Sequence, residues 1–81
     1  MNVRLSQRAV ERLAEAPQPV QRAFLKQIAF LVRNLNHPSL HAKKFDEGSG
    51  LWQARIDRDW RFYFIVDGNT YQIETIVPHP K

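Results

Sequence analysis

The 81-residue chain contains no cysteine, so it can form neither a disulfide nor a cysteine-based metal site. This absence fits a reducing cytoplasm, which is where we expect the protein to reside. The sequence also has no apolar run of transmembrane length and no secretory hydrophobic segment after Met1. We therefore expect a soluble protein that forms one small domain, residues 1–81, and does not contact a membrane.

Acidic residues are fewer than basic ones, with 8 Asp and Glu against 12 Lys and Arg and a formal net charge of +4. The excess comes from residues 1–36, since residues 37–81 carry the two signs in equal number. A basic small domain favours a polyanion or an acidic protein as its partner. Solubility alone explains the charge equally well.

Two segments of the first half carry apolar residues at helical spacing. Ser6 can cap a helix that runs to about Ala16, and Pro19 suits the first turn of a second helix that ends near Asn36. The short proline-containing gap between them predicts an antiparallel helix hairpin. The positions expected to be buried are Ala9, Val10, Leu13 and Ala16 in the first helix, and Val20, Phe24, Ile28, Leu31 and Leu35 in the second.

After Gly50 the apolar period changes from 3.6 to 2, which predicts strands. Turns at residues 57–59 and 68–69 divide this region into three strands, and residues 3–5 and 43–45 can add short ones. The pattern predicts an α+β fold, in which the N-terminal helix hairpin packs on a twisted antiparallel sheet. The sheet consists of a short N-terminal strand and a C-terminal meander.

The hydrophobic pattern also predicts the register of the meander. A three-residue turn at 57–59 places all apolar residues of the first two strands on one face, whereas a two-residue turn would mix the faces. In this register Arg55 lies directly opposite Arg61 on the polar face. Continued alternation along the third strand places Ile76 beside Arg61 and Glu74 beside Tyr63 on that face.

Two arginines in opposed positions repel each other. Either Glu74 and solvent neutralise the pair, or the pair binds a phosphate, whose oxygens suit the guanidinium fork. Tyr63 on the same face either stacks a base or simply covers the exposed sheet. The sequence leaves both questions open.

The three histidines are candidates for proton transfer or metal binding. His79 lies between two prolines and should emerge beside the turn at 57–59, where it either transfers protons or has no role. His37 and His41 have a spacing that suits a metal on a helix, but Pro38 between them argues against a helix. We expect no metal and no other cofactor.

These features together resemble the RelE/ParE toxin superfamily of bacterial toxin–antitoxin modules. The segments that carry the resemblance are the helix hairpin, His37-Pro38-Ser39-Leu40, Lys43-Lys44, Leu51 to Ile56, Trp60 to Phe64 and Pro78-His79. The resemblance implies a RelE-like fold. Its RelE/YoeB-like branch implies ribosome-dependent cleavage of mRNA, in which the ribose 2′-hydroxyl attacks the adjacent phosphate without a metal ion and translation is repressed.

The resemblance also implies residue roles. The candidate catalytic residues are Arg61, His79, Arg55 and Lys81. The candidate residues for binding RNA or the ribosome are Lys43, Lys44, Gln53 and Tyr63. The expected partners are the ribosome with its mRNA and an acidic, partly disordered antitoxin in a hetero-oligomer, with Ile65 and Ile76 as candidate antitoxin contacts.

The chain departs from the family pattern at three places, one of which is a later tyrosine of the RelE-like branch that this sequence lacks. Pro80 follows His79 where the YoeB-like branch has a tyrosine, and no glutamate occupies that branch's base position. The alternatives are therefore a ParE-like toxin that binds DNA gyrase without nuclease activity, or an inactive RelE-like homologue that acts as a binding module. A further alternative is a general nucleic-acid-binding domain that uses Arg22, Lys26 and Arg33 on one helix face, although such a face is more often an ordinary solvated one.

Overall fold

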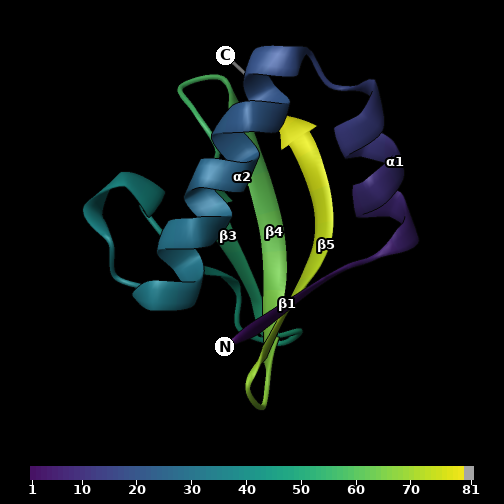
Figure 1. The fold of residues 1–81 in the computed structure, drawn as a ribbon. Helices are drawn as coiled ribbons and strands as arrows, with labels where there is room; N and C mark the ends of the chain where they lie inside the picture. The colour runs from purple at the N-terminus through teal and green to yellow at the C-terminus, as the bar shows by residue number, and fades with distance from the viewer. Residues whose placement is uncertain (80–81) are drawn as a thin grey trace.

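The computed structural model describes residues 1–79, which form two α-helices packed on one five-stranded sheet (Figure 1). The elements are β1 (Asn2–Leu5), α1 (Gln7–Glu15), α2 (Gln18–Arg33), the 3-10 turn η1 (Pro38–Leu40), β2 (Lys43–Asp46), β3 (Leu51–Arg55), β4 (Trp60–Asp67) and β5 (Thr70–Pro78). The predicted α+β class is confirmed. No helix in this part of the chain is long and apolar enough to cross a membrane.

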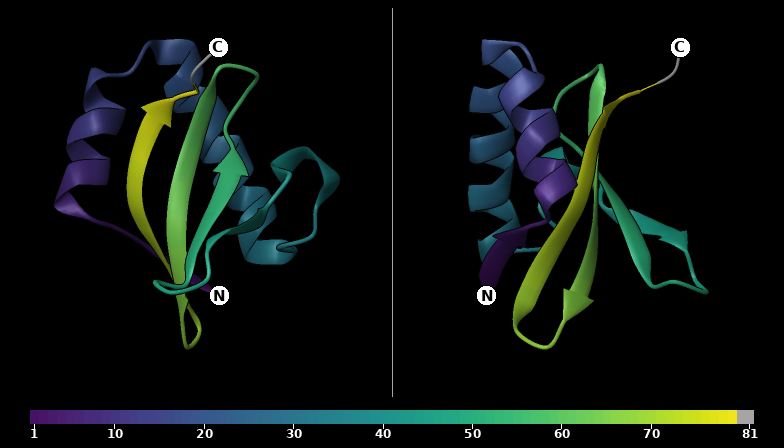
Figure 2. Two further views of the ribbon diagram at one scale, coloured as in Figure 1. Left: turned by 180° about the vertical axis from the view of Figure 1, so that it is seen from behind. Right: turned by 90° about the vertical axis from the view of Figure 1, so that its right-hand side faces the viewer.

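The sheet has the strand order β1-β5-β4-β3-β2. Strands β2 to β5 form the predicted antiparallel meander, but β1 pairs with β5 in parallel, with Asn2 opposite Thr70. The prediction of a purely antiparallel sheet is therefore wrong. Parallel neighbours need a long crossover, and here the chain between β1 and β5 includes both helices. Figure 2 shows both helices on one face of the sheet, with the other face uncovered.

Helix α1 begins at the predicted cap. The Ser6 hydroxyl accepts a hydrogen bond from the Ala9 N–H (3.0 Å) and donates one to the Glu74 carbonyl (2.7 Å), so the cap also ties the helix to β5. Ala9 and Ala16 are buried, but Val10 is 49% exposed. Its predicted burial is wrong, because the face that packs on the sheet passes through Ala9, and Val10 lies a quarter-turn away from it.

Helix α2 buries Val20, Phe24 and Leu31, as predicted. It ends at Arg33, three residues before the predicted end, and the N–H of Asn34 caps it by donating to the Phe30 carbonyl (2.8 Å). Buried side chains of α2 pack directly on the sheet. The Phe24 ring packs edge-on against Phe62 on β4, with ring centroids 5.5 Å apart.

The register between β3 and β4 agrees with the prediction. Trp52 lies opposite Phe64, Ala54 opposite Phe62, and Arg55 opposite Arg61. Ala54, Phe62 and Phe64 are buried beneath the helices. The two arginines consequently lie on the face that the helices leave uncovered.

A β-bulge changes the register between β4 and β5. The pairing begins as predicted, with Phe64 opposite Ile73, but shifts between Tyr63 and Phe64. Beyond the shift Phe62 lies opposite Ile76, and Arg61 lies opposite Val77. Ile76 is fully buried, so its predicted place beside Arg61 and its predicted contact with an antitoxin are wrong.

The physical reason for the bulge lies in the residues that it exchanges. The extra residue of a bulge reverses which side chains of the following strand face the core. Strict alternation would direct the Thr75 hydroxyl towards the helices. The bulge instead places the larger, wholly apolar Ile76 there and moves Thr75 to the opposite face beside Tyr63, so the layer beneath the helices buries more apolar surface.

Candidate functional site

The uncovered face of the sheet contains a cleft of about 390 Å³, which we call the basic cleft. Its lining residues are His41, Ala42, Lys43, Gln53, Ala54, Arg55, Arg61 and His79. Three of them are lysine or arginine, two are histidines, and none of the described lining residues is acidic. A concave site with one sign of charge concentrates ligands of the opposite sign.

Three parts of the chain build the cleft. The end of β3 and the start of β4 supply Arg55 and Arg61, and Lys43 of β2 lies opposite Gln53 of β3. The last strand, β5, ends at the same end of the sheet as the β3–β4 turn (Figure 1). There the His79 N–H donates to the Asp59 carbonyl (2.7 Å), which fastens the segment after β5 beside the cleft.

The β3–β4 turn holds Arg61 through one of its nitrogens. The Nη1 atom donates to the carbonyls of Asp57 (2.7 Å) and Trp60 (2.9 Å). Burial, and then the neighbouring charge of Arg55, lower the pKa of the Arg61 guanidinium below its ordinary value. An arginine in a protein nevertheless remains protonated. The negative charges of Asp57 and Asp59 act in the opposite direction without cancelling these effects, so a bound anion would compensate the charge of Arg61 further.

Arg55 has a similar deficit. Its Nε atom is buried and has no hydrogen-bond partner among the described residues. Within residues 1–79 no carboxylate lies at ion-pair distance from Arg55 or Arg61. Glu74, which the sequence offered as a neutralising group, lines a different pocket. The cleft thus contains two guanidinium charges without a carboxylate partner among residues 1–79, which an anion would neutralise.

Gln27 connects the cleft to the helix layer, and the sequence analysis missed it. Although it lies on α2, it is only 3% exposed. Its Nε2 donates to the carbonyls of Arg55 (2.9 Å) and Ser39 (3.0 Å), and its Oε1 accepts from the Ser39 hydroxyl (3.3 Å). Gln27 therefore joins the end of β3 to the loop that leads to His41. Its place in the apolar stripe between Phe24 and Leu31 was the signal in the sequence.

His41 is the second residue that the sequence analysis did not place in the site. It follows η1 in a left-handed backbone conformation (φ 47°, ψ 40°), and the chain turns there into the cleft. Its spacing of two from Lys43, which places both on one side of an extended segment, could have indicated this. No three His, Cys, Asp or Glu side chains in residues 1–79 are grouped so that they could hold a metal ion.

The remaining candidates lie elsewhere. Lys44 points away from the cleft, with Nζ 3.8 Å from a carboxylate oxygen of Glu47 and 5.6 Å from the ring centroid of Trp52. Tyr63 lies next to the cleft, where its hydroxyl accepts a hydrogen bond from Gln53 Nε2 (2.8 Å). Lys81 lies outside the described residues. The structure thus brings together five of the eight predicted residues: Arg61, His79, Arg55, Lys43 and Gln53.

The protein is therefore a small α+β domain with a basic cleft on the face of the sheet that the helices leave uncovered. No model of a known protein family matches the chain, and no curated protein sequence matches it. Solved structures do share its fold. A YoeB/ParE toxin from Agrobacterium tumefaciens superposes with a TM-score of 0.82 at 14% identity and covers 99% of this chain and 100% of its own.

Two further solved structures share this fold. YoeB from Staphylococcus aureus, solved as a dimer, gives a TM-score of 0.81 at 19% identity over 99% of this chain and 98% of its own. The RelE–RelB complex from Pyrococcus horikoshii gives 0.79 at 21% identity over 95% and 92%. The chain therefore has the same fold as these RelE and YoeB structures, which confirms the RelE-like fold that the sequence resemblance predicted.

Proposed function

We propose that this protein is the toxin of a type II toxin–antitoxin system, and that it represses translation by cleaving mRNA on the ribosome. One observation carries the proposal: two histidines and three cationic side chains line a single cleft. Metal-independent RNA cleavage needs proton-transfer groups on both sides of a phosphate and positive charge around it. The likeness of the fold to RelE and YoeB toxins supports the same activity.

In the proposed reaction one neutral imidazole, of His41 or His79, takes the proton of the ribose 2′-hydroxyl. The O2′ atom then bonds to the adjacent phosphorus while the bond from phosphorus to O5′ breaks. The other imidazole, in its protonated form, gives its proton to O5′. The products are a 2′,3′-cyclic phosphate and a free 5′-hydroxyl, and proton exchange with water restores both histidines.

The cations act on the phosphate itself. Negative charge on the non-bridging oxygens grows as the phosphorus becomes five-coordinate, and preformed donors stabilise that charge. Arg61 is suited to this role because the turn holds its Nη1, which orients the rest of the guanidinium. Arg55 and Lys43 add charge from β3 and β2. The pair His41 and His79 supplies an acid and a base without the glutamate and tyrosine of the YoeB-like branch.

The proposed partners follow from charge and from the related structures. RelE of P. horikoshii was solved with RelB, and YoeB of S. aureus with YefM. We propose that an acidic antitoxin binds this protein in a hetero-oligomer and covers the basic cleft.

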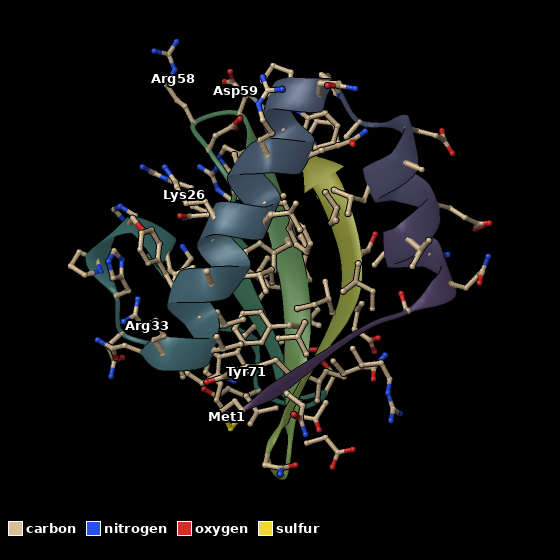
Figure 3. All side chains as sticks on the ribbon, viewed as in Figure 1. Met1, Lys26, Arg33, Arg58, Asp59 and Tyr71 are labelled. Atoms are coloured by element: carbon tan, nitrogen blue, oxygen red, sulfur yellow. The ribbon has the colours of Figure 1, made fainter. Side chains whose placement is uncertain are left out.

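Lys26 and Arg33 extend from α2 into solvent (Figure 3), and we propose that these side chains contact ribosomal RNA backbone.

The test is inducible expression in bacteria, followed by mapping of new mRNA 5′ ends. We expect growth arrest and new ends within translated codons. Arg61→Met should abolish both, whereas Arg12→Met, which removes the same charge from an exposed position on α1, should not. Growth arrest with intact messages, together with inhibition of DNA gyrase by the purified protein, would establish the ParE-like alternative instead.

A further inference from the structure

A second concave site adjoins the basic cleft on the uncovered face of the sheet. It has a volume of about 470 Å³, and we call it the aromatic pocket. Its lining residues are Arg8, Phe45, Ser49, Leu51, Tyr63, Ile65, Glu74 and Thr75. The Phe45 ring packs edge-on against Tyr63 with centroids 5.0 Å apart, yet Phe45 remains 56% exposed. An exposed aromatic ring at the mouth of a pocket is a feature of binding surfaces.

The two sites share a wall. Gln53 lines the basic cleft, Tyr63 lines the aromatic pocket, and their side chains are hydrogen-bonded at 2.8 Å. Gln53–Tyr63 and Arg55–Arg61 are successive pairs on the same face of β3 and β4. Two residues along a strand correspond to about 7 Å. One ligand can therefore have an anionic group in the cleft and a planar group in the pocket.

The polar lining of the pocket points to the kind of planar group. Glu74 supplies acceptors, Arg8 supplies donors, and the Thr75 hydroxyl is buried without a partner among the described residues. A purely apolar side chain would leave these groups without hydrogen bonds, which is unfavourable when they are covered. A nucleobase has an aromatic face for Phe45 and Tyr63 and a polar edge for the other groups.

We propose that the aromatic pocket binds one base of the RNA strand whose phosphate occupies the basic cleft. This inference rests on the proposed function, because it assumes an RNA phosphate in the cleft. It assigns base recognition to residues on the sheet, separate from the groups that transfer protons. The Glu74 carboxylate can accept from an exocyclic amine, which adenine, cytosine and guanine have and uracil lacks. Uridine should therefore bind most weakly.

The test uses nuclear magnetic resonance titration of the whole protein with a 2′-O-methylated trinucleotide of adenosine, which cannot be cleaved because its 2′-hydroxyl is blocked. The comparison ligands are the same backbone without bases, the uridine trinucleotide and inorganic phosphate. We expect the adenosine ligand to shift resonances of Phe45 and Tyr63 and to bind about 5- to 100-fold more tightly than the baseless backbone. Inorganic phosphate should shift only resonances of the cleft.

The variants Phe45→Ala and Tyr63→Phe examine the pocket directly. Phe45→Ala should remove the advantage of the base and leave phosphate binding unchanged. Tyr63→Phe keeps the ring but loses the bond to Gln53, so it should keep most of the advantage. Leu25→Ala, which removes a 63% exposed apolar side chain from α2, is the matched control and should change neither.

The outcomes separate the two proposals. Equal binding of adenosine, uridine and baseless ligands would overturn the base pocket while leaving the cleft as an anion site. An adenosine advantage that persists in Phe45→Ala would also overturn it, because the base would then dock elsewhere. If neither phosphate nor any trinucleotide shifts resonances of the cleft, the anion site itself, and with it the proposed function, is wrong.

Discussion

Arg55 and Arg61 occupy directly opposed positions on β3 and β4, and among residues 1–79 no carboxylate forms an ion pair with either. Like charges in opposed positions destabilise a sheet. The buried, unpartnered Nε of Arg55 adds to that cost. An arrangement that lowers the stability of the free protein and favours anion binding is typical of functional sites, where stability and activity conflict.

Replacement of Arg55 by methionine should therefore make the folded protein more stable. Arg55→Met removes the repulsion but keeps much of the apolar stem, so the free energy of unfolding should rise by about 0.5–1 kcal/mol. mRNA cleavage should fall at the same time. Urea denaturation measures the first effect, and Arg4→Met on the exposed part of β1 is the control, with little change expected. A destabilised Arg55→Met protein would show that Arg55 serves packing rather than anion binding.

The two histidines of the cleft should determine how cleavage depends on pH. One must be neutral and the other protonated, so the rate should pass through a maximum. His41→Ala and His79→Ala should each lower the rate by about 100- to 10,000-fold and flatten a different limb of the profile. Single-turnover cleavage on programmed ribosomes across a range of pH gives this measurement.

His37 provides the control for this prediction. Its ring stacks on Phe30 with centroids 3.9 Å apart, outside the cleft. His37→Ala should leave the shape of the pH profile unchanged. If His41→Ala has the same profile as the unmodified protein, His41 takes no part in proton transfer and the proposed acid–base pair is wrong.

Gln27 should contribute to stability through the three hydrogen bonds of its buried amide. Gln27→Leu keeps the size of the side chain but leaves the carbonyls of Arg55 and Ser39 without their donor. The free energy of unfolding should fall by about 1–3 kcal/mol. Gln7→Leu at the exposed start of α1 should change it by less than about 0.5 kcal/mol. Equal urea midpoints for the two variants would contradict the bridging role of Gln27.

Because of the bulge in β5, the burial of Ile76 and Val77 is the reverse of what simple alternation predicts, and so is the expected effect of replacing them. Ile76→Ala should lower the free energy of unfolding by about 2–5 kcal/mol, because Ile76 is fully buried. Val77→Ala should cost less, since Val77 is only half-buried on the open face beside Arg61. Thermal denaturation of the pair provides the measurement. A larger effect at Val77 would indicate that the strand continues without the bulge.

Local patterns in the sequence were sufficient to predict the start of a helix, the strands of the meander and the register of one strand pair. Ser6 marked the start of α1, the change of apolar period marked the strands, and turn length determined the register that places Arg55 opposite Arg61. These features depend on neighbours in the chain, on turn geometry and on burying one face. The same reasoning placed His79 beside the turn at 57–59, whereas the family resemblance indicated Lys43 and Gln53.

Only the tertiary structure decided the rest. The parallel pairing of β1 with β5 depends on how two distant segments meet, and the bulge depends on whether Thr75 or Ile76 fits beneath the helices. The places of Gln27 and His41 follow from contacts between α2, η1 and β3. Such contacts join residues far apart in the chain, so no local periodicity records them. The opposed arginines were therefore predictable from the sequence, whereas the positions of Gln27 and His41 beside them were not.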